Sequence, residues 1–344
     1  MTRYLITGGA GFIGVNAADH FARRGDTVVL LDNLSRWGTR ENLNWLRGQH
    51  PAIRLVEADV RSDAQALEAE AARCDVILHL AAQVAVTTSV SDPRTDFEIN
   101  ARGTLNVLEA ARRAAKPPIV IYSSTNKVYG GMEGVQVVED GNRYRYRDLP
   151  AGISEAQPLD FHSPYGCSKG AADQYVRDYA RIYGLRTVVL RQSCIYGTHQ
   201  FGIEDQGWVA WFTMRALMDL PVTIYGDGKQ VRDVLYVEDL VAAFDAAVAH
   251  IDRTAGQVYN IGGGPAYTLS LLDLMELLGK TAGRKMQHSF DAWRPGDQRV
   301  YISDVRKAAR DFGWRPAVSP EQGVGRMHSW MAAHLETIRG VYNV

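Results

Sequence analysis

Glycines at positions 8, 11 and 14 constrain the fold of this 344-residue chain more than any other feature. They lie in the run Thr7-Gly8-Gly9-Ala10-Gly11-Phe12-Ile13-Gly14, which follows a β-rich run at residues 3–7 and opens an amphipathic stretch at residues 12–24. Glycines at this spacing allow a tight turn and let backbone amides approach a pyrophosphate at the amino terminus of a helix. The alternative interpretation is a tight strand-to-helix turn without a ligand.

Short β-rich runs alternate with helical patterns through the first two thirds of the chain. The β-rich runs cover residues 3–7, 27–31, 53–57, 76–80, 119–123 and 187–191. Amphipathic stretches such as residues 12–24 and 63–73 lie between them and supply the crossover helices that parallel strands require. The sequence therefore predicts an α/β fold with a doubly wound parallel (Rossmann) sheet.

The alternation loosens after residue 196, where Gly and Pro become frequent and helical patterns follow at residues 269–278 and 305–312. We expect a dinucleotide-binding domain over residues 1–191 and a smaller C-terminal substrate-binding domain over residues 192–230 and 262–344. A strand-like start and a helical pattern predict that residues 231–261 return to the main sheet. The polar stretch at residues 131–150 is either an excursion near the mouth of the site or an inert surface loop.

Composition points to a globular protein that binds small molecules. Apolar residues make up 46% of the chain, charged residues 22%, and the formal net charge is -1, so no basic surface for nucleic acid is indicated. No apolar run approaches the roughly 18 residues that span a bilayer, and no leader precedes the first strand pattern, so we expect a cytoplasmic protein without a membrane partner. Cys74, Cys167 and Cys194 are too scattered to predict a disulfide framework or a metal site.

Asp32 ends the second predicted strand, where a carboxylate can bind the adenosine ribose hydroxyls and repel a 2′-phosphate. This favours NAD over NADP as the cofactor, although Arg36 lies close enough to leave NADP open. Further candidates lie in the glycine loop and after the ends of strands, where a doubly wound sheet presents its loops to a ligand. These candidates are Phe12, Ile13, Asn33, Ser35, Asp59, Val60, Leu80, Ala81, Ala82, Gln83 and Ser123.

Tyr165 and Lys169 lie four residues apart on a predicted helix that opens with Ser163 and Pro164. This spacing places both side chains on one face. An ammonium near the tyrosine favours the phenolate, so Tyr165 could act as a base near neutral pH. A surface pair is the alternative, and the glycine loop upstream makes it the weaker one. Thr125, in a run that leaves the fifth predicted strand, could hydrogen-bond the reacting oxygen or serve ordinary turn chemistry.

Together these residues resemble the extended short-chain dehydrogenase/reductase family of NAD-dependent nucleotide-sugar epimerases and dehydratases, over essentially the whole chain. The resemblance implies a catalytic triad of Thr125, Tyr165 and Lys169, with Asn100 in the cofactor shell. It also implies that Arg232 and Arg294 bind the diphosphate of a nucleotide-sugar substrate, a role that suits the forked guanidinium. Solvated surface positions are the alternative for both arginines.

The residues after Thr125 bear on the reaction type. Dehydratases of this family carry acidic residues there, whereas this chain has Asn126 and Lys127, so the resemblance implies epimerisation at C2 of a CDP-hexose. The chain departs from the 2-epimerase pattern at Gln192, where histidine is expected, and at His199, where arginine is expected. The substrate candidates are Thr87, Thr125, Asn126, Lys127, Gln192, Ser193, Gln206, Arg232 and Arg294.

Other functions stay open on the sequence. A UDP-sugar 4-epimerase would use the same triad, and a net oxidoreductase or a non-catalytic dinucleotide sensor could share the fold. The resemblance also implies a homodimer or a higher homo-oligomer, paired through the helix after Asn100 and the helix that carries Tyr165.

Overall fold

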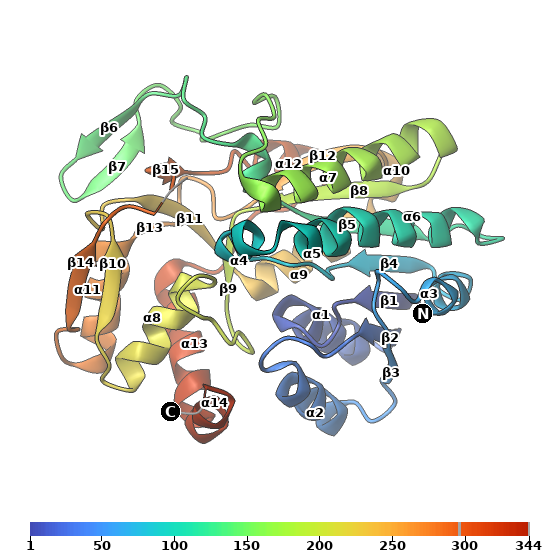
Figure 1. Cartoon of the computed structure of the whole chain (residues 1–344), viewed down its shortest axis with the longest axis horizontal. Coiled ribbons are helices and arrows are strands. Elements are labelled where there is room, and N and C mark those ends of the chain that lie inside the picture. The colour runs from blue at the N-terminus through green and yellow to red at the C-terminus, as the bar shows by residue number, and fades with distance from the viewer. Residues whose placement is uncertain (295–296, 343–344) are drawn as a thin grey trace.

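The computed structural model describes residues 1–294 and 297–342. Seven parallel strands form its main sheet, in the order β12-β8-β5-β4-β1-β2-β3 (Figure 1). The predicted doubly wound parallel sheet is therefore confirmed. The strands are β1 (Arg3–Thr7), β2 (Thr27–Asp32), β3 (Arg54–Glu57), β4 (Val76–His79), β5 (Ile119–Thr125), β8 (Thr187–Gln192) and β12 (Gln257–Ile261).

Helices cover both faces of the main sheet because alternate strand residues bury apolar side chains on opposite faces. In β1, Ile6 belongs to the apolar core that includes residues of α1, α2, α9 and α12, whereas Leu5 belongs to the core that includes residues of α3, α6 and α7. The first group comprises α1 (Phe12–Arg23), α2 (Thr39–Gln49), α9 (Val237–Ala249) and α12 (Arg306–Phe312). The second group comprises α3 (Ala64–Ala71), α6 (Gly103–Arg113) and α7 (Ser163–Tyr183).

The order of the strands reverses between β1 and β4, so the loops that follow these two strands diverge and leave a crevice at the carboxyl edge. Gly8 lies at this point with a φ of +67°, and a Cβ there would lie 2.7 Å from the backbone nitrogen of Ala81. A Cβ on Gly14 would lie 2.4 Å from the carbonyl oxygen of Gly8. Glycine is therefore required at both positions for the loop and helix α1 to pack together.

A second region packs around its own apolar core beside the main sheet, on the left of Figure 1. Its strands form a parallel pair, β10 with β14, and a sheet in which β11 pairs with β9, β13 and β15. The strands are β9 (Cys194–Tyr196), β10 (Val222–Tyr225), β11 (Val231–Tyr236), β13 (Thr268–Ser270), β14 (His288–Asp291) and β15 (Val300–Tyr301). The helices are α8 (Trp208–Leu217), α11 (Leu271–Ala282), α13 (Pro320–Ala333) and α14 (Leu335–Tyr342).

The structure corrects one expectation about residues 231–261. Strand β11 does not return to the main sheet, because its backbone pairs with β9, β13 and β15. The chain returns one element later, through α9, which packs under the main sheet, and through β12, which pairs with β8. A strand pattern shows that a segment is extended but does not show which neighbour it will pair with, and this explains the error.

Except for α10 (Ile251–Thr254), which directly precedes β12, the remaining elements lie around the carboxyl edge of the main sheet. Residues 131–150 contain a hairpin whose Tyr144 and Tyr146 pack against Val128 and Tyr129, directly after β5. This places the hairpin beside the strand that carries Thr125. The elements are α4 (Val86–Ser91), α5 (Pro93–Phe97), the π-helix Glu98–Arg102, the 3-10 helix Asn126–Tyr129, β6 (Val137–Asp140), β7 (Arg143–Tyr146) and α10 (Ile251–Thr254).

Candidate active site

A cleft with about 1090 Å³ of empty space opens at the point where the strand order reverses. Most of the predicted cofactor residues line it: Gly8, Gly11, Phe12, Ile13, Gly14, Asp32, Asn33, Ser35, Arg36, Asp59, Val60, Leu80, Ala81 and Ala82. The sequence did not assign a role in cofactor binding to ten further lining residues: Leu31, Trp37, Thr39, Asn42, Ala58, Val84, Ile99, His199, Gln200 and Phe201. Leu31, Ala58 and Val84 flank predicted positions, whereas residues 199–201 come from a distant segment that no local pattern connects to this cleft.

The glycine loop offers unpaired backbone donors to this cleft. Helix α1 begins after Gly11, whose missing side chain leaves the helix without a capping hydrogen bond. The amides of the first helical turn have no partner within a helix, and the helix dipole adds positive potential at the same end. The loop therefore fits the pyrophosphate of a dinucleotide.

The Asp32 carboxylate is fixed at the rim of this cleft. Its Oδ2 accepts a hydrogen bond from the backbone nitrogen of Ala10 at 3.0 Å, and its Oδ1 accepts one from Leu34 at 2.8 Å. Burial raises the pKa of Asp32, while the two backbone amides act in the opposite direction. Each oxygen keeps a lone pair for a ribose hydroxyl, so Asp32 fits the role expected for an NAD site.

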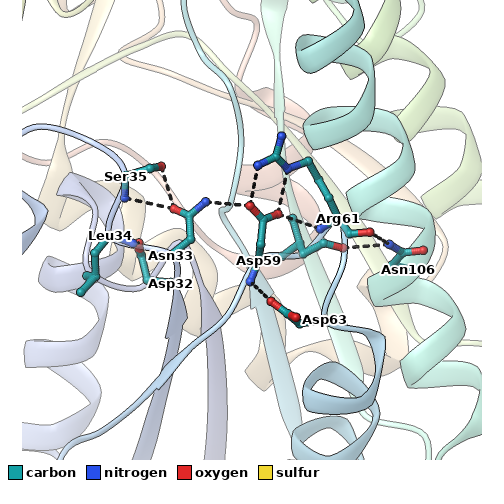
Figure 2. A network of polar contacts seen from close by, with 9 residues as sticks. Asp32, Asn33, Leu34, Ser35, Asp59, Arg61, Asp63 and Asn106 are labelled. Atoms are coloured by element: carbon teal, nitrogen blue, oxygen red, sulfur yellow. Dashed lines mark hydrogen bonds and ion pairs between the residues drawn. The ribbon is translucent and has the colours of Figure 1, made fainter.

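A second polar network shapes the end of the cleft beside β2 and β3 (Figure 2). Asp59 accepts hydrogen bonds from Arg61 at 2.7 and 3.0 Å and from Asn33 at 2.9 Å. Arg61 is the main cause that lowers the pKa of Asp59 to about 2, so the carboxylate stays charged. The network joins the loops after β2 and β3 and therefore gives this end of the cleft a defined shape.

Thr125, Tyr165 and Lys169 lie at the junction of β5 and α7. Thr125 is the last residue of β5, and its hydroxyl interacts with the buried phenol of Tyr165. The Lys169 ammonium donates to the carbonyl oxygen of Ser123 at 2.6 Å, so it binds the same strand. Ser163 starts α7, and its hydroxyl accepts a hydrogen bond from the backbone nitrogen of Gly166. The structure thus brings the predicted triad together.

The charge states of the triad differ from the expectation. Burial raises the pKa of Tyr165 to about 12, and the Thr125 hydroxyl only partly opposes this effect. Burial lowers the pKa of Lys169 to about 7, while the carboxylates of Asp173 and Asp96 raise it. The expected lowering of the tyrosine pKa by an ammonium is therefore wrong for the ligand-free site, because burial is the larger effect.

The predicted cofactor residues Gln83, Asn100, Ser123, Tyr165 and Lys169 do not line the first cleft. Asn100 is buried in the π-helix, and its amide nitrogen donates to Gln83, Asp96 and Ser168 at 3.1 Å each. Since Ser168 precedes Lys169 on α7, Asn100 connects the loop after β4 to the helix of the triad. π-Helical turns are frequently found at functional sites.

A second cleft, with about 1140 Å³ of empty space, continues from the first, because Gln206 lines both. Five predicted substrate residues line it: Thr87, Lys127, Gln206, Arg232 and Arg294. The other four, Thr125, Asn126, Gln192 and Ser193, are not part of its lining. The sequence missed Val86, Cys194, Glu204, Asp205, Gly207, Trp208, Phe212, Thr223, Tyr225, Gln230, Leu271 and Asp297.

The predicted residues outside the lining of the second cleft lie on β5 and β8 or directly after these strands. Thr125 and Gln192 pair across β5 and β8, and both are more than nine-tenths buried. The Ser193 hydroxyl donates to the backbone oxygen of Asp233 at 2.9 Å and therefore stabilises β11 rather than facing the cleft. Positions 295 and 296, directly after Arg294, lie outside the described residues.

The second cleft combines aromatic side chains with cations. Arg294 lies over the ring of Tyr225, with its guanidinium carbon 3.8 Å from the ring centre, and its Nη2 is 3.0 Å from the Asp205 carboxylate. Arg232 lies on β11 and faces the same space. Aromatic surface suits a nucleobase and guanidinium groups suit phosphates, so the cleft fits a nucleotide.

A buried tyrosine, threonine and lysine beside a dinucleotide-shaped cleft define an enzyme of the short-chain dehydrogenase/reductase type. Residues 4–262 match the NAD dependent epimerase/dehydratase family, and the chain belongs to this family. Its cofactor is NAD. The chain is 45% identical over 338 residues to CDP-paratose 2-epimerase of Salmonella typhi, covering 96% of this chain and 99% of that protein.

Two further comparisons lie in the same family. The chain is 32% identical over 355 residues to dTDP-glucose 4,6-dehydratase of Salmonella typhimurium, covering 98% of this chain and 95% of that one. Its structure resembles that of the UDP-glucose 4-epimerase of Thermotoga maritima, solved with UDP-glucose, with a TM-score of 0.84 and 32% identity over 97% of this chain and 99% of the other. Among the described residues, no helix has the length and apolar character needed to cross a membrane.

Proposed function

We propose that this enzyme epimerises C2 of a CDP-hexose, in a reaction of the CDP-paratose to CDP-tyvelose type. The observation that carries the proposal is the pair Asn126 and Lys127 directly after Thr125 at the sugar end of the site. In the dehydratases of this family a carboxylic acid is expected to protonate the leaving hydroxyl, and neither side chain is a carboxylic acid. The 45% identity to CDP-paratose 2-epimerase supports the same reaction.

The triad residues are suited to a reversible oxidation at one carbon. When bound, NAD⁺ supplies the hydride acceptor and a positive charge near the triad. Tyr165 is placed to accept the proton of the reacting hydroxyl as the general base, and Thr125 is placed to orient the same oxygen by hydrogen bonding. The Lys169 side chain is bound to strand β5 through the carbonyl oxygen of Ser123. The sugar becomes a 2-keto-sugar, presents its other face, and receives back the hydride and the proton, so no net redox change results.

A panel of CDP-hexoses and UDP-hexoses incubated with the purified protein tests this function. We expect NMR to show inversion at C2 of a CDP-sugar without consumption of added NADH. The variant Tyr165→Phe should lose roughly 10²- to 10⁴-fold in kcat, the usual contribution of a general base. Tyr267→Phe is the matched control, because Tyr267 lines neither cleft and lies outside α7.

Three outcomes would contradict the proposal. Activity only on UDP-sugars at C4 would show the alternative, a UDP-sugar 4-epimerase. With substrate deuterated at C2, loss of the label to water in the product would exclude direct return of the same hydride. Steady consumption of external NADH would instead reveal a net oxidoreductase.

We also propose that the enzyme acts as a homo-oligomer in the cytoplasm. On α7, Tyr175, Ile182 and Tyr183 are exposed and lie at spacings of seven and eight residues, on one face of the helix. This apolar face supports the expected pairing through α7. Leu108 on α6 does not contribute, since it is fully buried within the chain. Light scattering of the purified protein tests for a mass of at least two chains.

A further inference from the structure

Lys127 connects the catalytic triad to the substrate cleft. Its backbone nitrogen donates a hydrogen bond to the Thr125 hydroxyl at 3.2 Å, in the 3-10 helix Asn126–Tyr129 that follows β5. Its side chain lines the second cleft together with Arg232. Among the lining residues of that cleft, Lys127 is therefore the cation whose own backbone is hydrogen-bonded to a triad residue, Thr125.

Lys127 and Arg232 form a pair of cations without a close carboxylate. Within residues 1–294 and 297–342, no carboxylate oxygen lies within 4.0 Å of either charged group, whereas Arg294 already contacts Asp205 at 3.0 Å. Burial is the main cause that lowers the pKa of Lys127 to about 8, Arg232 lowers it further, and Asp297 and Cys194 raise it. Two neighbouring cations in a partly buried space are stabilised by an anion that carries more than one negative charge.

We infer that Lys127 binds the phosphate that is attached to the sugar, and that this contact determines which sugar carbon reaches Thr125 and Tyr165. The inference rests on the proposed function and deepens it. The aromatic residues Phe212 and Tyr225 lie on α8 and β10, elements that carry no residue of the triad, and suit the nucleoside. The phosphate next to the sugar then falls nearest to the cation beside the triad.

The position of the reacting carbon explains why a cation is useful here. C2 is bonded to the anomeric carbon that carries the diphosphate, whereas C4 lies on the opposite side of the ring. A sugar that presents C2 to the triad must therefore bring its first phosphate close to Thr125, and a sugar that presents C4 holds that phosphate far away. A lysine two residues after Thr125 favours the first arrangement.

Binding of CDP and CMP to the NAD-loaded enzyme tests the inference, because CMP lacks the phosphate that Lys127 would contact. We expect Lys127→Met to weaken CDP binding about 10- to 100-fold, the range for a lost charge-assisted hydrogen bond, and to change CMP binding less than about threefold. Lys127→Arg should restore most of the CDP affinity. Isothermal titration calorimetry measures both ligands, and NAD binding and melting temperature report folding.

Lys229→Met is the matched control, since Lys229 forms an ion pair with Glu139 and lines neither cleft. Equal losses for CDP and CMP, or an unchanged CDP affinity in Lys127→Met, would overturn the inference. If Lys127→Met does not fold, Lys127→Gln is measured in the same way. A wild type that epimerises only UDP-sugars at C4 overturns the proposed function instead, so the two failures are distinguishable.

Discussion

At the scale of single residues, Asp32 is held by the amides of Ala10 and Leu34 before any ligand binds. A preorganised carboxylate binds ribose hydroxyls without a further cost of ordering and repels a 2′-phosphate. On the sequence alone, Arg36 left NADP open as the cofactor. In the structure, its guanidinium donates to the side chain of Gln206 at 2.8 Å. This contact directs Arg36 toward the junction of the two clefts.

The variant Asp32→Asn should therefore raise the dissociation constant for NAD about tenfold and reduce the preference for NAD over NADP, because the charge is removed while one acceptor remains. Fluorescence titration with both dinucleotides measures the change. Glu57→Gln at the end of the neighbouring strand β3 is the control, because Glu57 lines neither cleft. An unchanged ratio of NAD to NADP affinity in Asp32→Asn would contradict the assignment.

Lys169 should make the stability of the fold depend on pH. The pKa of Lys169 is about 7 in the folded chain, whereas an ordinary lysine has a pKa of 10.5. Between pH 7 and pH 10.5, the unfolded chain therefore holds a proton that the folded chain has lost. The free energy of unfolding therefore rises with pH across this window. We expect urea unfolding to show that wild type gains stability relative to Lys169→Met from pH 7 to pH 10.

Lys280 is an exposed lysine on α11. For Lys280→Met, the difference in free energy of unfolding between wild type and variant should stay the same from pH 7 to pH 10. If the difference in free energy of unfolding between wild type and Lys169→Met is constant from pH 7 to pH 10, the pKa of Lys169 is not lowered in the folded chain.

At the scale of elements, α7 is joined to the sheet by a buried ion pair. The Arg191 guanidinium on β8 binds both oxygens of the Asp173 carboxylate on α7 at 2.9 Å, and both side chains are at most 2% exposed. Ser124, the neighbour of Thr125 on β5, donates to the same carboxylate at 2.8 Å. One carboxylate therefore positions the three elements that carry Thr125, Gln192 and Lys169.

Arg191→Met should destabilise the fold by about 3–5 kcal/mol, because it leaves the charge of the Asp173 carboxylate buried without an opposite charge. The double variant Arg191→Met with Asp173→Leu should recover part of this loss, since no charge remains buried. Urea unfolding measures both. Arg113→Met, which removes an exposed ion pair with Glu68, should cost at most about 1 kcal/mol. Equal losses in the single and double variants would contradict the argument.

At the scale of the whole molecule, residues 199–207 connect the two clefts. Residues 199–201 and Gln206 line the cofactor cleft, while residues 204–207 line the substrate cleft. Asn42 on α2 donates to the backbone oxygen of His199 at 3.2 Å, and Thr87 on α4 donates to Asp205 at 3.2 Å. Either ligand alone should therefore restrict this segment.

Hydrogen exchange followed by mass spectrometry measures this restriction. We expect peptides from residues 199–207 to exchange more slowly after addition of NAD alone and after addition of CDP alone, because each ligand contacts the segment and disfavours its local opening. Peptides from the β6–β7 hairpin, which lines neither cleft, are the internal control. Protection by only one of the two ligands would show that the segment belongs to one cleft.

The amino-acid sequence by itself predicted the parallel sheet, the glycine loop, Asp32 and the pair Tyr165 and Lys169. Each of these features depends on residues that are close together in the chain, so that a turn, a helix face or a strand end is visible in the local pattern. Tyr165 and Lys169 are one helical turn apart, and residues 8–14 form one turn and the start of helix α1. The shift of the Tyr165 pKa toward 12 was not visible, because burial depends on elements far away in the sequence.

Only the tertiary structure decided the partners of β11, the shape of the substrate cleft and the double role of residues 199–207. Trp208, Tyr225 and Leu271 meet at that cleft from three different elements, and no spacing in the chain connects them. Strand pairing and cleft lining follow from which apolar faces bury one another across the whole molecule. A local pattern determines what a segment can be, whereas long-range packing determines what it lies beside.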